Sequence, residues 1–258
     1  MSGLYCKHLN KDYSDKMVVK GSKIAELSYM YNILASDNRK SNKNVLVVGE
    51  REGREGVTLY TSETLDLNVD NLDCIDISDL EPNSYLSDLV DSKLNVNFIN
   101  GDLVAYEPDN NYDYVICISV LEHFGMKYGN HNMFGADDTF EIMNDDFIRW
   151  NHDLRGILKM SSLLNDDASR VIITIPTGGY MNYDENGFPF LRYYNRQRRD
   201  IIQTLLQENE YNIYDEKFYI SNDFVNWDET NVGSMSEQNY RHMNPYSPNG
   251  LWCFCVGK

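Results

Sequence analysis

Residues 44–56 have the sequence Asn-Val-Leu-Val-Val-Gly-Glu-Arg-Glu-Gly-Arg-Glu-Gly, and this stretch decides the fold class. Its four consecutive apolar residues, Val45 to Val48, are typical of a strand buried on both faces, as in a parallel sheet. Glycines follow at 49, 53 and 56, where a backbone without Cβ atoms lets a ligand come close. An equally simple interpretation is that these glycines only turn the chain. The dinucleotide pattern G-x-G-x-x-G is not met, because Arg51 stands where its second glycine belongs.

Further apolar stretches follow, and the first two of them end in an aspartate, Asp76 and Asp102. They predict strands over residues 72–76, 96–102, 114–121, 170–176, 217–220 and 251–256. Helical spacing of apolar residues predicts helices over 22–35, 79–91, 146–164 and 195–207. Strands that alternate with helices predict a doubly wound α/β fold, with a mostly parallel sheet and helices on both faces. In such sheets the ligand lies at the carboxyl ends of the strands, where the strand order reverses.

Composition limits the function classes. The chain has 258 residues, and its 23 Lys and Arg against 40 Asp and Glu give a net charge of -17. Most of such a surface repels a polyanion, so nucleic acid is not an expected partner. The odd number of cysteines, with Cys74 and Cys117 inside apolar strands, indicates reduced buried thiols and a cytoplasmic protein. No apolar run has the ~20 residues that span a bilayer, so no membrane segment is expected.

The residues after the predicted strands form an ordered series. Gly49 and Gly53 come first, Asp76 and Asp102 end the next two strands, and Glu122-His123 follows the fourth. Over residues 40–180 this series resembles the motifs of class I S-adenosylmethionine-dependent methyltransferases, and the later elements resemble the small-molecule and sugar methyltransferases of that superfamily. The resemblance implies a Rossmann-like, mostly parallel sheet of seven strands with an antiparallel C-terminal strand. It also implies one domain over 1–258, with an N-terminal arm and helix at 1–43, a cofactor-binding core at 44–176, and substrate loops and late strands at 177–258.

The same resemblance implies S-adenosylmethionine as the cofactor. Asp76 would accept hydrogen bonds from the ribose diol, as the acid does in dinucleotide folds. Asp102 would receive the adenine amino group, with Leu103 as an apolar face beside it. The structural alternatives are a solvated acid at the strand end for Asp76 and a helix-capping aspartate for Asp102. The full set of expected cofactor-binding residues is Gly49, Glu50, Gly53, Asp76, Ile77, Asp102, Leu103, Ser119 and Val120.

Two histidines are candidates for the general base. His123 directly follows the fourth strand, and histidine titrates near neutral pH; the alternative is that it packs under the cofactor. His131 lies in the polar, glycine-rich stretch that comes next. Tyr128, Arg192 and Tyr193 are expected to contact the acceptor, because arginine suits an anion and tyrosine suits a sugar or an aromatic group. The run of arginines from 192 to 199 also fits a solvated helix face. No metal site is expected.

These observations predict an enzyme that methylates oxygen on a small molecule or saccharide. N-methylation of an amino sugar or another amine is the alternative within enzymes. A non-catalytic binding protein with the same fold is the alternative outside them, favoured by Arg51 in place of a glycine and by the lack of a Pro-Gly-Gly turn before residue 170. Homo-oligomerisation is left open.

Overall fold

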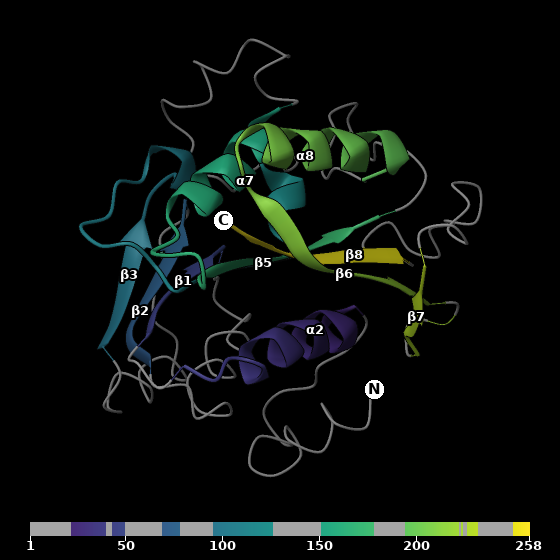
Figure 1. Ribbon diagram of the computed structural model, residues 1–258, viewed down its shortest axis with the longest axis horizontal. Helices are drawn as coiled ribbons and strands as arrows, with labels where there is room; N and C mark the ends of the chain where they lie inside the picture. The colour runs from purple at the N-terminus through teal and green to yellow at the C-terminus, as the bar shows by residue number, and fades with distance from the viewer. Residues whose placement is uncertain are drawn as a thin grey trace.

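A twisted sheet forms the centre of the computed structural model (Figure 1). The structure describes residues 22–39, 43–49, 69–77, 95–125, 151–177, 194–221, 223, 226–231 and 250–258. Within these residues the sheet has eight strands in the order β3-β2-β1-β4-β5-β8-β6-β7. Their bounds are β1 Lys43–Val48, β2 Val69–Asp76, β3 Asn95–Asn100, β4 Tyr114–Ile118, β5 Arg170–Pro176, β6 Asn212–Ile220, β7 Asp228–Thr230 and β8 Gly250–Gly257.

The predicted mostly parallel sheet with an antiparallel C-terminal strand is confirmed, although the number of strands and the end of the fourth strand differ from the prediction. The pairs β1–β2, β1–β4, β2–β3 and β4–β5 are parallel, whereas β8 pairs antiparallel with both β5 and β6. The described residues contain eight strands rather than seven, because the short strand β7 adds to the edge of β6. The fourth strand was expected to reach residue 121 but ends at Ile118, since Ser119 adopts a left-handed backbone with φ 51°.

The apolar run that opens the core is buried on both faces, as its sequence predicts. Leu46 and Val48 belong to the core on one side of the sheet, while Val45 and Val47 belong to the core on the other. Strand β8 repeats this pattern: Trp252 and the alternate residues after it face the first core, and the cysteines face the second. In the described part of the chain, Cys74, Cys117, Cys253 and Cys255 are buried.

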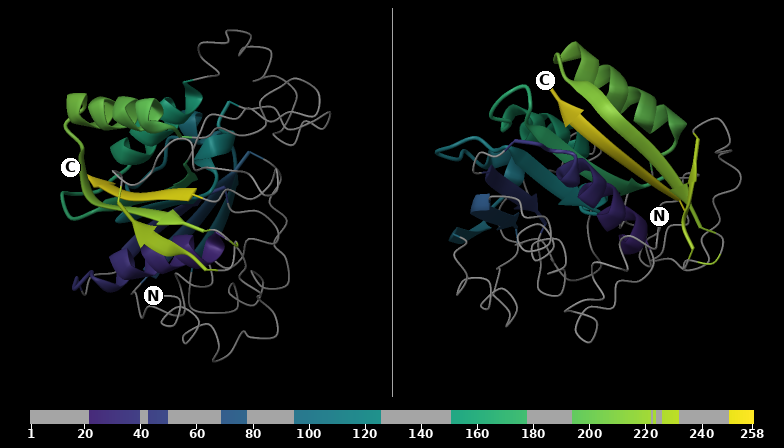
Figure 2. Two further views of the ribbon diagram at one scale, coloured as in Figure 1. Left: turned by 90° about the vertical axis from the view of Figure 1, so that its right-hand side faces the viewer. Right: turned by 60° about the horizontal axis from the view of Figure 1, so that its bottom comes forward.

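Helices cover both faces of the sheet. Helix α2 (Lys23–Ala35) packs on one face, and helices α7 (His152–Ser162) and α8 (Arg196–Glu208) pack on the other. The left view of Figure 2 shows the sheet between them. Two short 3-10 helices, η1 (Leu103–Ala105) and η2 (Leu121–His123), follow β3 and β4. The helix predicted over 79–91 lies outside the described residues, and none of the helices within them is long and apolar enough to cross a membrane.

Helix α2 buries polar side chains as well as the apolar ones whose spacing predicts the helix. Leu27, Met30 and Leu34 are buried as expected, but so are Glu26 and Tyr29. The Tyr29 hydroxyl donates a hydrogen bond to the Asp215 backbone oxygen on β6, at 3.1 Å. A polar side chain reaches the interior here because a partner on the sheet is available to it.

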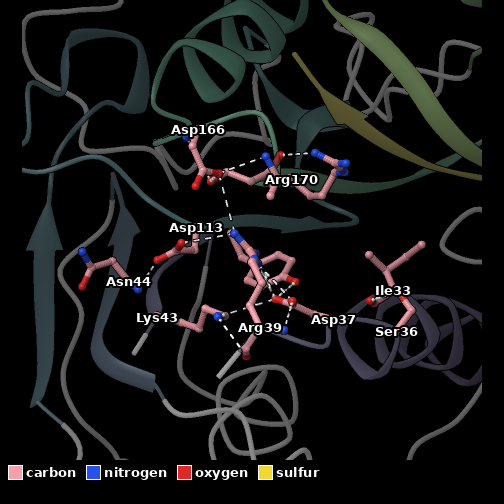
Figure 3. Close-up of polar contacts among 12 residues, drawn as sticks. Ile33, Ser36, Asp37, Arg39, Lys43, Asn44, Asp113, Asp166 and Arg170 are labelled. Carbon is pink, nitrogen blue, oxygen red and sulfur yellow. Dashed lines mark hydrogen bonds and ion pairs between the residues drawn. The ribbon is translucent and has the colours of Figure 1, made fainter. Parts of the chain in front are cut away.

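An ionic cluster joins the end of α2 to the edge of the sheet at which the parallel strands begin (Figure 3). We call this the Arg39 cluster. The Arg39 guanidinium lies 2.9 Å from an Asp37 oxygen, 3.5 Å from Asp113 and 3.6 Å from Asp166. The Tyr114 hydroxyl donates to Asp37 at 2.6 Å. Burial by itself raises the pKa of Asp37, but hydrogen bonds from Arg39 and Tyr114 outweigh it and lower the pKa to about 2.

Candidate functional site

The opposite edge of the sheet, where the parallel strands end, is referred to as the carboxyl edge. Strand order reverses there between β1 and β4, because β1 pairs with β2 on one side and with β4 on the other. A ligand at such a switch point meets the residues that follow both strands. The segments after β1 and β4, in which the sequence predicts Gly49, Ser119 and Val120 as ligand-binding residues, therefore lie at one switch point.

Gly49 ends β1 in a conformation that favours glycine. Its φ is 75°, and its N–H donates to the Ile75 oxygen of β2 at 2.7 Å. A Cβ added at Gly49 would lie 2.3 Å from Val120 Cγ1 and 2.9 Å from Val120 Cβ. The segment after β4 thus lies directly against the backbone after β1. This glycine is needed for close approach as well as for its φ, so the simple chain-turn interpretation does not account for it.

The two predicted acids lie at neighbouring strand ends. Asp76 is the last residue of β2 and pairs in register with Asn100 of β3. The Asp76 backbone oxygen accepts a hydrogen bond from Gly101 N–H at 2.9 Å, and Asp102 follows directly. The alternative of a solvated Asp76 is wrong, because this residue is only 9% exposed. Its neighbour Ile77 is half-buried.

Asp102 caps a short helix, which is the structural alternative to cofactor binding for this residue. Its Oδ1 accepts a hydrogen bond from Val104 N at 2.9 Å and so caps η1. The side chain nevertheless keeps 30% exposure, and a carboxylate has about four acceptor positions. Capping and ligand binding are therefore compatible in one side chain. Leu103 beside it is buried in the core, which places an apolar surface next to this acid.

His152 is a further neighbour of the candidate site and was not among the predicted site residues. It begins α7, is 6% exposed, and its Nε2 lies 4.0 Å from Asp102 Oδ1. Its ring packs on Phe124, with 5.9 Å between the centroids. A histidine inside a predicted amphipathic helix gives no local signal of this contact, because the contact depends on how α7 packs against the segment after β3.

The segment after β4 contains the remaining described candidates. Ser119 and Val120 are half-buried, and Ser119 N–H donates to the Thr174 oxygen of β5 at 2.9 Å. The Ser119 hydroxyl donates to Glu26 Oε1 of α2 at 2.5 Å. His123 ends η2 and is half-buried, with its N–H donating to the Val120 oxygen at 2.9 Å. The structure thus brings Gly49, Ser119 and Val120 together and places His123 one 3-10 turn further on.

Several predicted site residues lie outside the described residues. These are Glu50, Gly53, Tyr128, His131, Arg192 and Tyr193.

The arginines of α8 differ from one another. Arg196 is exposed, as a solvated helix face requires. Arg198 pairs with the buried Asp153 of α7. Arg199 is 7% exposed, and its Nη1 donates to Thr177 Oγ1 at 2.6 Å and to the Tyr194 oxygen at 2.9 Å. The solvated-face alternative therefore fails for two of these three arginines, which bind protein groups instead.

Comparison with known proteins supports the fold. No family model matches the chain, and no curated protein matches its sequence. A solved structure of 1,6-didemethyltoxoflavin-N1-methyltransferase from Burkholderia thailandensis is similar, with a TM-score of 0.54 and 14% identity over 99% of this chain and 85% of that one. A methyltransferase structure from Clostridium acetobutylicum has a TM-score of 0.50 and 12% identity, over 99% and 96% of the two chains. The chain therefore has the fold of class I S-adenosylmethionine-dependent methyltransferases.

Proposed function

We propose that the protein is an S-adenosylmethionine-dependent methyltransferase, acting as one domain, with its cofactor at the carboxyl edge. The observation that carries this proposal is the meeting of Gly49, Asp76 and Asp102 at the ends of β1, β2 and β3, beside Ser119. Two carboxylates at adjacent strand ends suit a ligand rich in hydroxyl and amino donors, because an ionised carboxylate only accepts hydrogen bonds. These two acceptors therefore fit the hydroxyl and amino groups of a nucleoside.

The residues have distinct roles in this proposal. Asp76 would bind the ribose diol, and Asp102 would bind the adenine amino group through the acceptor capacity that capping leaves over. Gly49 and the Ser119–Val120 segment would bound the methionine side. When bound, the cofactor supplies an electrophilic methyl group. The chain's own task is then to hold the acceptor in line, and orientation of this kind contributes roughly 7–11 kcal/mol in well-aligned systems.

We propose a small molecule or saccharide as the acceptor, methylated on oxygen. A hydroxyl must lose its proton on methylation, and His123 at the end of η2 is the described candidate to accept it. N-methylation remains the second candidate, because the similar Burkholderia thailandensis protein is an N-methyltransferase. The two differ in their need for a base, since an acceptor amine that is already neutral requires none. The acidic surface argues against nucleic acid as the acceptor.

Isothermal titration with S-adenosylhomocysteine tests the proposal. We expect saturable binding of this ligand and no binding of NAD, which shares the adenosine but needs a pyrophosphate site. Release of S-adenosylhomocysteine from S-adenosylmethionine in the presence of candidate acceptors then tests for catalysis. Absence of binding at millimolar S-adenosylhomocysteine would contradict the proposal. Binding without any turnover across alcohol and amine acceptors would favour the non-catalytic alternative.

A further inference from the structure

A buried carboxylate on α2 touches the candidate site from outside the cofactor-binding core. Glu26 is 0% exposed and lies among the apolar side chains of α2 that pack on the sheet. Burying a charge is costly unless it is paired and hydrogen-bonded. Glu26 has both kinds of partner. Lys23 lies 2.8 Å from Oε2, and the Ser119 hydroxyl donates to Oε1 at 2.5 Å.

Lys23 strengthens the same connection. Its ammonium group also donates a hydrogen bond, at 3.3 Å, to the backbone oxygen of Ile118, the last residue of β4. The first turn of α2 therefore holds the end of β4 at two consecutive residues, Ile118 through its backbone and Ser119 through its side chain. A surface ion pair would not explain this arrangement, because the Glu26 carboxylate has no solvent exposure.

Ser119 needs such support because its backbone is strained. Its φ of 51° lies in the left-handed region that L-residues with a Cβ rarely adopt. Strain of this kind persists only where the surroundings impose it, and it is concentrated at functional sites. A hydrogen bond to an ionised carboxylate is stronger than one between neutral groups. Glu26 thus supplies a strong bond at the strained residue.

Val120 directly follows this strained residue, and its side chain lies against the backbone of Gly49. The space between the two does not hold even one carbon atom, since a Cβ added at Gly49 would lie 2.3 Å from Val120 Cγ1. A shift of the turn after Ser119 would therefore move the wall of the site. We propose that Glu26 is a positioning residue for the cofactor site, which holds Ser119 in the left-handed conformation and so seats Val120 against Gly49. This inference rests on the proposed function.

Substitution of Glu26 tests the inference, with S-adenosylhomocysteine as the probe. We expect Glu26→Ala to weaken its binding about tenfold or more, measured by isothermal titration on protein that circular dichroism shows to be folded. Tyr29→Phe is the matched control, because it removes a hydrogen bond that anchors the same helix to β6, away from the site. It should lower the melting temperature without changing the affinity. Equal affinities for wild type and Glu26→Ala would overturn the inference.

A second pair of variants separates positioning from direct ligand contact and does not depend on the folding of Glu26→Ala. Ser119→Ala loses the hydroxyl but keeps the cost of the left-handed backbone, whereas Ser119→Gly loses both. We expect Ser119→Ala to weaken binding of S-adenosylhomocysteine about tenfold and Ser119→Gly to weaken it less, because only the alanine variant keeps the cost of the left-handed backbone. We also expect Ser119→Gly to restore binding in the Glu26→Ala background. Equal losses in the two serine variants would show that the hydroxyl acts otherwise than through the turn.

The two proposals fail in different ways. If wild type does not bind S-adenosylhomocysteine, the proposed function is wrong and this inference falls with it. If wild type binds and Glu26→Ala binds equally well, only the positioning role is wrong.

Discussion

Gly49→Ala is the sharpest test of the carboxyl edge, because the structure gives two separate reasons for a glycine there. The left-handed backbone costs a residue with a Cβ roughly 1–2 kcal/mol. The new methyl would also meet Val120 at 2.3 Å from Cγ1 and 2.9 Å from Cβ. Because the Cβ atom is involved, rotation of the Val120 side chain does not clear the contact. Overpacking of this kind typically costs 1–3 kcal/mol.

An effect on the unfolded state partly offsets these two costs. Alanine has less conformational freedom than glycine in the unfolded chain, which stabilises the folded variant by about 0.4–1 kcal/mol. We therefore expect Gly49→Ala to lower the free energy of unfolding by about 1–4.5 kcal/mol. Natural domains have stabilities of roughly 5–15 kcal/mol, so the variant should remain folded at room temperature. Relief of the clash would move Val120, and binding of S-adenosylhomocysteine should weaken about tenfold or more, a loss of about 1.4 kcal/mol.

Urea unfolding followed by circular dichroism measures the first effect, and isothermal titration measures the second. Gly101→Ala is the matched control, since a Cβ there would meet nothing nearer than 4.0 Å. We expect it to change the free energy of unfolding by less than about 1 kcal/mol. A Gly49→Ala protein as stable as Gly101→Ala would refute the close approach of the two segments.

Three further outcomes are expected. Asp76→Asn should weaken S-adenosylhomocysteine binding about tenfold to a hundredfold through loss of charge-assisted hydrogen bonds. Asp109→Asn changes an exposed acid before β4 and should leave this binding unchanged. If Asp76→Asn binds as tightly as wild type, the ribose contact lies elsewhere. His123→Gln should cut turnover roughly 10²–10⁴-fold and remove the acidic limb of the pH–rate profile, so an active variant with an unaltered profile would rule out the base role. Asp37→Asn should lower the free energy of unfolding by about 2 kcal/mol at neutral pH. Because the pKa of Asp37 falls to about 2 on folding, wild type should lose this advantage between about pH 4 and 2, and a difference that persists unchanged to pH 2 would contradict this.

The sequence predicts the core strands well because their signals are local. A run such as Val45 to Val48 needs no knowledge of its neighbours to indicate burial on both faces, and the structure confirms it. Strand β7 is missed because its residues Asp228–Thr230 have no apolar alternation. They form a strand only because the edge of β6 offers them partners. The strand count therefore depends on a tertiary contact.

Some features of the candidate site could likewise be predicted from the sequence, and others depend on tertiary contacts. Gly49, Asp76 and Asp102 could be found because residues after parallel strands meet at one edge of the sheet. The burial of Asp76 could not, since it depends on what packs around the strand end. Glu26 was missed for a related reason. One weak signal was present, because Glu26 stands four residues before Met30 and so shares its buried helix face.

Helix α2 links the two ends of β4, and this explains why an element before the core strands matters to the site. Its first turn contacts Ile118 and Ser119 at the end of β4. At the other end, Asp37 accepts a hydrogen bond from Tyr114 at the start of the same strand. The helix therefore runs opposite to β4 and is fixed at both of its ends by ionic groups, Glu26 on one side and the Arg39 cluster on the other. Because both anchors are charged, the position of α2 along β4 is defined more narrowly than apolar packing alone would define it, since hydrogen-bonded ion pairs are directional and burial is not. A fixed register of α2 on β4 is what allows one carboxylate on the helix to set the backbone of one residue at the site.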